Sequence, residues 1–284
     1  MAYPSGLHMI EHPPTAGWDG HDGPAVVLVH GALDRAASFR RTIRRLDDLG
    51  VVAYDRRGYG RSDPLPTPAT LADHVADLLA VVDGLPVAGP VSAVGHSLGG
   101  DVVIAAAIAA PTRFASIGAY EPPMPWLGFH PTGATTGRWP PPGADAAEEA
   151  ERFFRRMVGD DAWSRLPEAD RARRRSEGPA LVADLAAIRG PAPFDVTSLT
   201  VPVAFGRGGP ASRPHHRESI AWLADHVPGA QLVDVPAAGH GAHLSHPDAF
   251  AAFVRAVVAL ADTGAGLADT GAGLADRGVE AQVR

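Results

Sequence analysis

Short apolar runs rich in β-branched residues alternate with segments of helical spacing along much of this 284-residue chain. Four runs have the length and composition of buried strands: residues 25–30, 50–55, 91–95 and 115–120. The segments between them carry apolar side chains at helical spacing: 38–49, 71–82 and 98–110. This alternation predicts an α/β fold in which helices cover both faces of a parallel sheet.

The alternation stops after residue 121 and resumes at residue 201. The first part of this interruption contains two clusters of proline. Three polar helices are expected in its second part: 146–158, 160–165 and 178–188. Later elements are expected as strands at 201–206 and 231–235 and helices at 214–227 and 247–261. Because the interruption is too long for an ordinary loop, it predicts an inserted helical cap, or lid.

This pattern divides the chain into three parts. We expect an α/β core made of residues 1–121 and 199–261, a helical cap at 122–198, and a tail at 262–284. The tail contains a seven-residue unit, 262–268, that is repeated at 269–275. Its glycine-rich composition predicts a flexible segment without a catalytic role.

Composition excludes several classes of function. The net charge of −7 argues against a nucleic-acid partner, and the absence of cysteine excludes disulfides and thiolate metal sites. No run reaches the roughly 18 apolar residues that a membrane span needs, and the N-terminus lacks the features of a secretory signal. A soluble cytoplasmic protein with no membrane partner is expected. The composition does not indicate an oligomeric state.

Residues 95–99 read Gly-His-Ser-Leu-Gly and lie between a predicted strand and a predicted helix. This setting is the one that a nucleophile elbow requires, so Ser97 is the candidate nucleophile. Close neighbours two residues to either side must lack side chains, and the helix N-terminus favours developing negative charge. The alternative is a glycine-rich turn whose serine has no catalytic role.

Two further segments supply the remaining chemistry. Acyl transfer needs donors for an oxyanion, and the backbone N–H groups of Leu98 and Ala32 are the candidates, with Leu33 as the alternative to Ala32. His240 lies between a predicted strand and a predicted helix, where it can act as general base. Although His243 and His246 lie nearby, no zinc pattern such as H-E-x-x-H appears, and no metal is expected.

These motifs resemble, in the same order, those of the α/β-hydrolase superfamily. The matching residues are His30-Gly31, the segments 55–62 and 95–100, Gly239-His240, Pro247 and Phe250. The resemblance implies an eight-stranded, mostly parallel sheet, a helical cap above the active site, and a Ser–acid–His triad that needs no cofactor. It also implies that Asp55 and Arg57 belong to a structural turn near the site.

The chain departs from this family at the third member of the triad. Similar members carry Gly-x-x-Asp after the strand that begins at residue 201, but here the residues are Gly206-Arg-Gly-Gly209. We expect Glu121 to supply the acid, because it ends the strand after the nucleophile strand and strand ends gather at one edge of a parallel sheet. The alternatives are a carboxylate that only anchors the lid, or an incomplete triad.

The predicted lid contains many of the chain's aromatic residues, which suggests an apolar substrate pocket. Trp126, Phe129 and Trp139 are the candidate substrate-binding residues, although core packing is an equal alternative. The arginine-rich run 171–175 is expected to be the solvated face of a helix.

The sequence thus predicts a serine hydrolase that cleaves a small-molecule carboxylic ester, lactone or thioester through an acyl-enzyme. Two alternatives use the same triad: a cofactor-free perhydrolase or haloperoxidase, and a carbon–carbon bond hydrolase. A third alternative is a binding protein that kept the fold and lost turnover.

Overall fold

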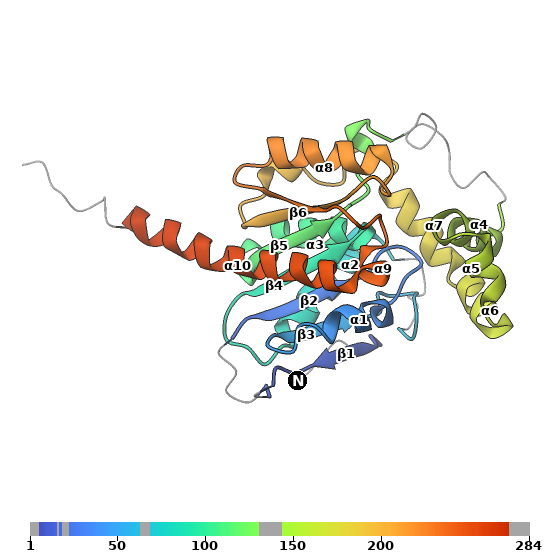
Figure 1. The fold of residues 1–284 in the computed structure, drawn as a ribbon, viewed down its shortest axis with the longest axis horizontal. Coiled ribbons are helices and arrows are strands. Elements are labelled where there is room, and N and C mark those ends of the chain that lie inside the picture. Colours follow the sequence, from blue (N-terminus) through green and yellow to red (C-terminus); the bar gives the residue numbers. More distant parts are fainter. Residues whose placement is uncertain (1–5, 16, 19–22, 63–68, 131–143, 273–284) are drawn as a thin grey trace, which may run out of the picture.

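The computed structural model describes residues 6–15, 17–18, 23–62, 69–130 and 144–272. A sheet runs through the middle of the molecule, and helices cover both of its faces (Figure 1). The α/β class predicted from the alternation of strands and helices is confirmed.

The described part of the chain forms one seven-stranded sheet in the order β1-β3-β2-β4-β5-β6-β7. Its strands are β1 Met9–His12, β2 Ala25–Val29, β3 Gly50–Tyr54, β4 Val91–His96, β5 Phe114–Tyr120, β6 Val203–Gly208 and β7 Gln231–Val235. Strand β1 is antiparallel to β3, and the other pairs are parallel. The resemblance implied eight strands. The described residues form seven strands, with β1 alone ahead of β2, which is one strand fewer than the resemblance implied.

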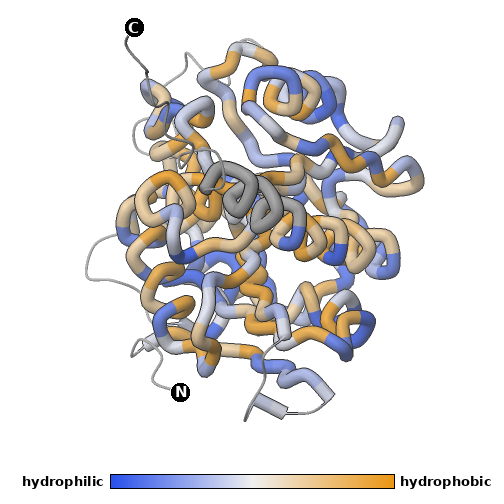
Figure 2. Tube along the Cα trace, turned by 90° about the vertical axis from the view of Figure 1, so that its left-hand side faces the viewer, coloured by the Kyte–Doolittle hydropathy of each residue, from blue (hydrophilic) through white to orange (hydrophobic). Residues whose placement is uncertain are grey.

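Helices pack on the sheet in two groups. One face carries α2 Leu71–Asp83, α3 Leu98–Ala109 and α8 Pro214–His226, and the other carries α1 Arg40–Ile43, α9 Ala242–Ser245 and α10 Pro247–Ala272. Because successive strand residues point to opposite faces, Val27 packs with the first group and Val26 with the second. Hydrophobic segments, shown in orange in Figure 2, accordingly run through the interior of the molecule.

A helical insert lies between β5 and β6. It contains α4 Ala146–Val158, α5 Asp160–Arg165, α6 Glu168–Ser176 and α7 Gly178–Ala187. Short 3-10 turns occur at Ala36–Phe39, Pro111–Arg113, Pro125–Leu127 and Val196–Ser198. Three of the four helices match the predicted ranges. The arginine-rich run was expected on a helix, but the bounds of α6 were not predicted, because its largely charged sequence shows no apolar spacing.

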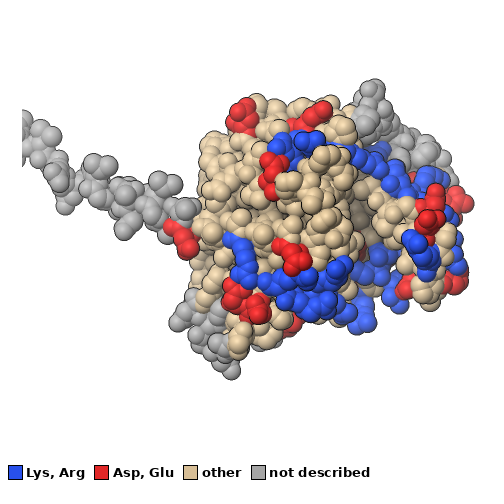
Figure 3. Space-filling model, viewed as in Figure 1, with Lys and Arg blue, Asp and Glu red and all other residues tan. Residues whose placement is uncertain are grey.

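The arginine-rich run lies on α6 and is only partly solvated. Arg171 and Arg175 pair with the carboxylates of Glu168 and Glu151, and acidic and basic side chains mingle over the insert in Figure 3. Arg174 instead turns inward, where its guanidinium lies over the Phe154 ring and donates to the carbonyl of Leu33. The solvated-face prediction is therefore wrong for Arg174.

Two helices differ in length from the prediction. The helix expected at 38–49 is limited to α1 and its preceding 3-10 turn, because the turn-forming Asp47, Asp48 and Gly50 end it early. Helix α10 was expected to end at residue 261 but continues to Ala272, into the repeated segment. A helix already nucleated gains one hydrogen bond for each residue added, and this favours its continuation although three of residues 262–272 are glycine. No helix in the described ranges is long and apolar enough to cross a membrane.

Candidate active site

Ser97 occupies the turn between β4 and α3 in a backbone conformation that residues other than glycine rarely adopt. Its φ is 52° and its ψ is −131°, and helix α3 begins at the next residue. A Cβ on Gly95 would overlap the backbone of Gly99, and one on Gly99 would overlap the backbone of Val29. The two glycines of the motif are thus required by close approach of the backbone, as an elbow demands.

His240 and Glu121 meet beside this turn, although 119 residues separate them in the chain. His240 follows β7 and Glu121 follows β5, so both lie at the carboxyl edge of the sheet, as Ser97 does. Nδ1 of His240 donates a hydrogen bond of 2.9 Å to Oε2 of Glu121. The structure therefore brings the predicted acid and base into direct contact.

The Glu121 carboxylate is fully buried, and its second oxygen is bound as well. Oε1 accepts hydrogen bonds from the backbone N–H of Gly208 (2.8 Å) and from the hydroxyl of Ser212 (2.5 Å). Burial raises the pKa of Glu121, but the hydrogen bonds from His240, Ser212 and Gly208 and the charge of His240 lower it more, so the net pKa lies below its ordinary value. The carboxylate is therefore ionised at neutral pH.

His240 is also held by groups that sequence analysis did not single out. Nε2 of His96 donates to the carbonyl oxygen of His240 at 2.8 Å, and the His216 ring stacks on the His240 ring with centroids 4.5 Å apart. Burial, with the nearby His243 and His240, keeps the pKa of His96 far below its usual range, so His96 is neutral. His96 could have been singled out from the sequence, because it lies inside the elbow motif. No sequence signal pointed to Ser212 or His216.

The segment of residues 30–33 lies against the nucleophile turn. A Cβ on Gly31 would lie 2.9 Å from that of Ser97, so this position must remain glycine. The Arg56 guanidinium is fully buried and donates to the carbonyls of His30 (3.0 Å) and Gly31 (3.2 Å), which fixes the segment. Burial, with the charge of Arg56, lowers the pKa of His30 to about 4, so this buried imidazole is neutral.

Three non-glycine residues in the described ranges have positive φ: Leu33, Ser97 and Glu121. All three border the site. A side chain in this region costs about 1–3 kcal/mol and persists only where its surroundings hold it. In the described residues, backbone strain is therefore concentrated at the candidate nucleophile, at the candidate acid and in the segment of residues 30–33.

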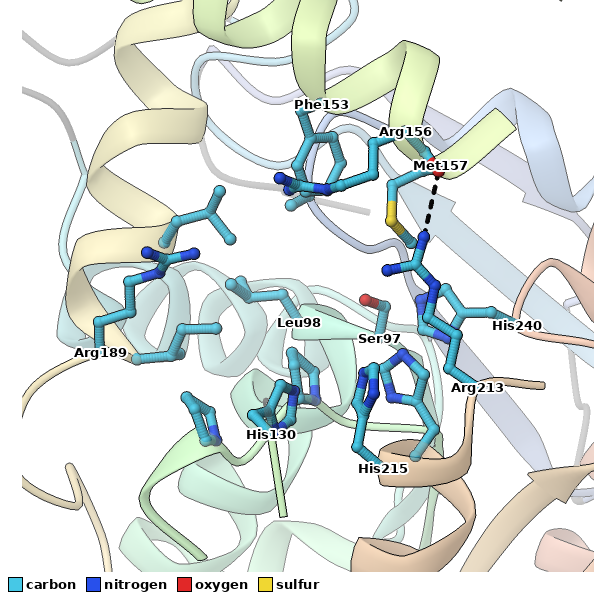
Figure 4. Close-up of a pocket in the computed structure, with 16 residues that line it drawn as sticks. Ser97, Leu98, His130, Phe153, Arg156, Met157, Arg189, Arg213, His215 and His240 are labelled. Atoms are coloured by element: carbon cyan, nitrogen blue, oxygen red, sulfur yellow. Dashed lines mark hydrogen bonds between the residues drawn. The ribbon is translucent and has the colours of Figure 1, made fainter. Parts of the chain in front are cut away.

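Two cavities meet at Ser97. The first has a volume of about 240 Å³ and contains Leu98 in its wall, and the second has a volume of about 410 Å³. Five residues belong to the walls of both: Ala32, Ser97, Phe153, Met157 and His240. Figure 4 shows Ser97, Leu98 and His240 bordering the first cavity. The nucleophile candidate thus has room on both sides for the two halves of a substrate.

Two of the three aromatic residues predicted to contact the substrate, Trp126 and Phe129, lie outside the walls of both cavities. Trp126 packs edge-on against Phe194, with centroids 5.5 Å apart, and neither Trp126 nor Phe129 belongs to the wall of either cavity. Trp139 lies outside the described residues. Because the chain turns Trp126 onto the core, Phe153 of α4 is the aromatic side chain that reaches both cavities.

Among the described residues, three groups of side chains have possible metal ligands within 4.8 Å of one another: Glu121/His216/His240, Asp34/His96/His243 and His130/His215/His216. The first two contain His–carboxylate hydrogen bonds, His240–Glu121 and His243–Asp34. In the third, the rings of His130 and His215 lie with centroids 4.5 Å apart. That the protein works without metal or cofactor stays a prediction.

A parallel sheet with a serine at the strand–helix turn after β4, and a helical insert after β5, defines the class of α/β-fold hydrolases. The chain belongs to the alpha/beta hydrolase family, whose sequence model matches residues 26–253.

The relatives of the chain have diverse activities. It is 36% identical to lipase LipV of Mycobacterium tuberculosis over 104 residues, which are 36% of this chain and 39% of the lipase. It is 29% identical to polyketide synthase ThaQ of Burkholderia thailandensis over 247 residues, which are 81% of this chain and 12% of the synthase. The chain therefore matches less than half the length of either protein. Other relatives are named epoxide hydrolases and haloperoxidases.

Solved structures show the same fold. The enol-lactonase from Burkholderia xenovorans LB400 superposes with a TM-score of 0.66 at 20% identity, and the match covers 89% of this chain and 96% of the lactonase. At this identity the similarity establishes the fold, and the reaction has to be argued from the site.

Proposed function

We propose that the protein is a serine hydrolase that cleaves a carboxylic ester, lactone or thioester through an acyl-enzyme. The observation that carries the proposal is the hydrogen bond between His240 and the buried Glu121, beside a serine held in an elbow. Relatives named as a lipase and an enol-lactonase agree with this class of substrate.

In the proposed first step, Oγ of Ser97 bonds to the carbonyl carbon of the substrate while Nε2 of His240 takes the hydroxyl proton. The carbonyl electron pair moves onto its oxygen, where the backbone N–H groups of Ala32 and Leu98 bind it. The tetrahedral intermediate then expels the alcohol or thiol, which takes the proton from His240. Water repeats the sequence on the acyl-enzyme and releases the acid.

Glu121 acts through His240 in this scheme and is a positioning residue. By accepting from Nδ1–H, its carboxylate selects the tautomer whose Nε2 is free to accept the serine proton. It also stabilises the imidazolium that forms, because it is ionised and excluded from water.

We propose that the insert serves as the lid of this site. Phe153 and Met157 of α4 belong to the walls of both cavities, and Leu185 of α7 belongs to the wall of the first. A lid of this kind excludes water from the acylation step and sets the shape of the substrate.

The test combines a fluorophosphonate probe with turnover of chromogenic esters. We expect the probe to label the wild type at Ser97, located by peptide mass spectrometry. Ser97→Ala should lose both labelling and turnover, the latter by more than about 10³-fold. Ser164→Ala, at an exposed serine of α5, is the matched control and should keep both.

Other outcomes would replace the proposal. Labelling at another serine, with more than about a tenth of turnover left in Ser97→Ala, would refute the assignment. Labelling at Ser97 without ester turnover would favour the perhydrolase or carbon–carbon hydrolase. A folded protein that takes no label would favour the binding protein.

A further inference from the structure

Three arginines from three segments surround the first cavity. Arg156 belongs to α4, Arg189 follows α7, and Arg213 immediately precedes α8. Figure 4 shows their guanidinium groups on different sides of the space that Ser97 borders. A substrate half that enters this cavity is therefore placed among them.

No acidic side chain belongs to the described wall of this cavity. On the outer side of the insert, by contrast, Arg155 pairs with Glu151 at 2.7 Å. Neither Arg156 nor Arg213 forms such a pair with any described residue; Arg213 donates instead to the backbone carbonyl of Arg156. The positive charges of Arg156 and Arg213 thus have no carboxylate partner among the described residues on the side that faces the site.

The grouping of these cations is unfavourable by itself. Partial burial, together with the charges of Arg213 and Arg152, lowers the pKa of Arg156, and partial burial with the charge of Arg156 lowers that of Arg189. Guanidinium groups gathered in this way favour an anion, which relieves their mutual repulsion and can accept two hydrogen bonds from each.

Histidines at the floor of the same cavity add neutral hydrogen-bonding groups. His216 is only 5% exposed, and its buried Nδ1 has no hydrogen-bond partner among the described residues. Nδ1 of His130 is in the same situation. Burial, with the charges of His215 and Arg189, lowers the pKa of His130 to about 4, so its imidazole is uncharged at neutral pH. Both residues belong to the wall of the first cavity, so they add polar groups without negative charge beside the arginines.

The second cavity does not share this charge. Its basic residues Arg35 and Arg174 both lie near the carboxylate of Glu177, at 2.9 Å and 3.8 Å. Apolar side chains such as Leu33 and Phe154 make up other parts of its wall. The two sides of the nucleophile therefore differ in the chemistry they accept.

We propose that the substrate carries a carboxylate, and that this group binds in the first cavity between Arg156, Arg189 and Arg213. The inference rests on the proposed function, since it names the substrate class of that site. The neutral half of the substrate occupies the second cavity, with the scissile carbonyl at Ser97 between them.

The test compares esters that differ in one carboxylate. One pair carries it in the acyl half: the mono-p-nitrophenyl ester of adipic acid against p-nitrophenyl hexanoate. A second pair carries it in the leaving group: 4-carboxyphenyl against 4-carbamoylphenyl hexanoate. In one of the pairs we expect kcat/KM to be at least about tenfold higher for the anion. Because Arg156 and Arg213 are exposed at the cavity mouth, the preference should shrink as salt is added.

Arginine variants identify the source of the preference. Arg156→Met and Arg189→Met should each reduce the ratio of kcat/KM for the two esters, on the order of tenfold. Arg189→Lys should keep part of the ratio, because a lysine retains the charge without the planar pair of donors. Arg165→Met, at an exposed arginine of α5, is the matched control and should leave the ratio unchanged.

Failure of this inference is distinguishable from failure of the proposed function. If the wild type hydrolyses the neutral esters at least as well as both anionic ones, the inference is overturned while the hydrolase assignment stands. If Ser97 takes no label and no ester turns over, the hydrolase assignment fails instead. Calorimetry of adipate with Ser97→Ala then still tests the cavity: binding weakened by Arg189→Met supports an anion site, and no binding overturns it. Stronger binding of inorganic phosphate than of adipate would also overturn the carboxylate.

Discussion

The Glu121 carboxylate accepts hydrogen bonds from three donors: His240, Ser212 and the backbone of Gly208. Two of them occupy Oε1 and leave Oε2 to His240. This division fixes the orientation of the carboxylate and hence that of the imidazole. A side chain without the negative charge could keep the shape of this arrangement but not its electrostatics.

Glu121→Gln should lower kcat by something like 10³–10⁴-fold. The amide oxygen can still accept from Ser212 and Gly208, but its NH₂ group would then face Nδ1 of His240 and favour the opposite tautomer. Nε2 would carry a proton and could not accept the one from Ser97. Steady-state kinetics should show the loss in kcat with a much smaller change in KM, and labelling of Ser97 should slow in parallel.

Glu218→Gln, at an exposed position of α8, is the control and should behave as the wild type. Near-normal turnover in Glu121→Gln would show that the carboxylate only anchors the structure. A collapse of melting temperature with unchanged specific activity of the remaining folded protein would lead to the same conclusion.

The sequence was enough to select Ser97, His240 and Glu121 as candidates, because the feature that identifies each of them lies in its own short segment. A glycine-flanked serine, a histidine after a strand and a carboxylate at a strand end can be recognised one at a time. The contacts of Ser212 and His216 could not be predicted, since they depend on how α8 approaches the edge of the sheet. The direction of Trp126 was unpredictable for the same reason.

At the scale of elements, a buried ion pair joins the insert to the core. Asp184 of α7 accepts from the Arg56 guanidinium at 2.8 Å, from the Tyr59 hydroxyl at 2.6 Å and from His74 at 3.1 Å. Arg56 and Asp184 are 0% and 2% exposed. Since Arg56 also holds the carbonyls of His30 and Gly31, the insert and the oxyanion segment are connected through one guanidinium.

Asp184→Asn should lower the free energy of unfolding by about 3–5 kcal/mol at pH 7, because it leaves a buried guanidinium without its counter-charge. Activity should fall as well, since Arg56 would hold residues 30–33 less firmly. Urea denaturation and ester turnover measure the two effects. Asp195→Asn, at an exposed aspartate that only caps a short turn, is the control, with an expected loss of about 1 kcal/mol or less.

The pair also predicts how stability depends on pH. Burial raises the pKa of Asp184, but Arg56 and His74 lower it more, so its folded-state pKa lies below the unfolded value of about 3.9. A depressed pKa contributes stability that is complete above pH 4–5 and is lost as pH falls toward the folded value. The wild type should therefore lose more stability than Asp184→Asn between about pH 5 and pH 3. Equal losses would contradict the assignment.

Elements whose sequence shows one strong pattern were predictable. Strand β2 is a continuous apolar run, and all five of its residues are buried. Helix α2 begins with a capping box formed by Thr70 and Asp73, which lie close together in the sequence. The bounds of helix α6 escaped prediction because the Arg175–Glu151 ion pair and contacts with α4 stabilise it, and these arise only after folding. The predicted end of the helix at α1 was wrong, because turn-forming residues compete there with the helical spacing of apolar side chains.

For the molecule as a whole, the described packing of α10 ends well before the helix does. Its last buried side chain in the described part of the chain is Leu260, at 5% exposure, and Figure 1 shows the end of the helix extending away from the sheet. Residues beyond this point contribute no described core contact. We therefore predict that residues 262–284 can be removed without loss of the fold.

Deleting residues 262–284 should change the melting temperature by less than about 2 °C, since changes away from the core usually stay within about 0.5 kcal/mol. Ester turnover should be unaltered, because the segment lies far in the chain from both cavities. Differential scanning calorimetry and kinetics on the shortened chain test this. A decrease of several degrees would reveal that the tail packs on the core.

Gly209 stands where the resemblance places the acid of related sequences, and there is no room for a side chain there. A Cβ on Gly209 would overlap the carbonyl of Pro236, and one on Gly208 would lie 2.9 Å from the Glu121 carboxylate. An aspartate at position 209 would therefore require the backbone near Pro236 to move. In this backbone conformation position 209 cannot hold a carboxylate, whereas the Glu121 carboxylate already contacts His240 from the end of β5.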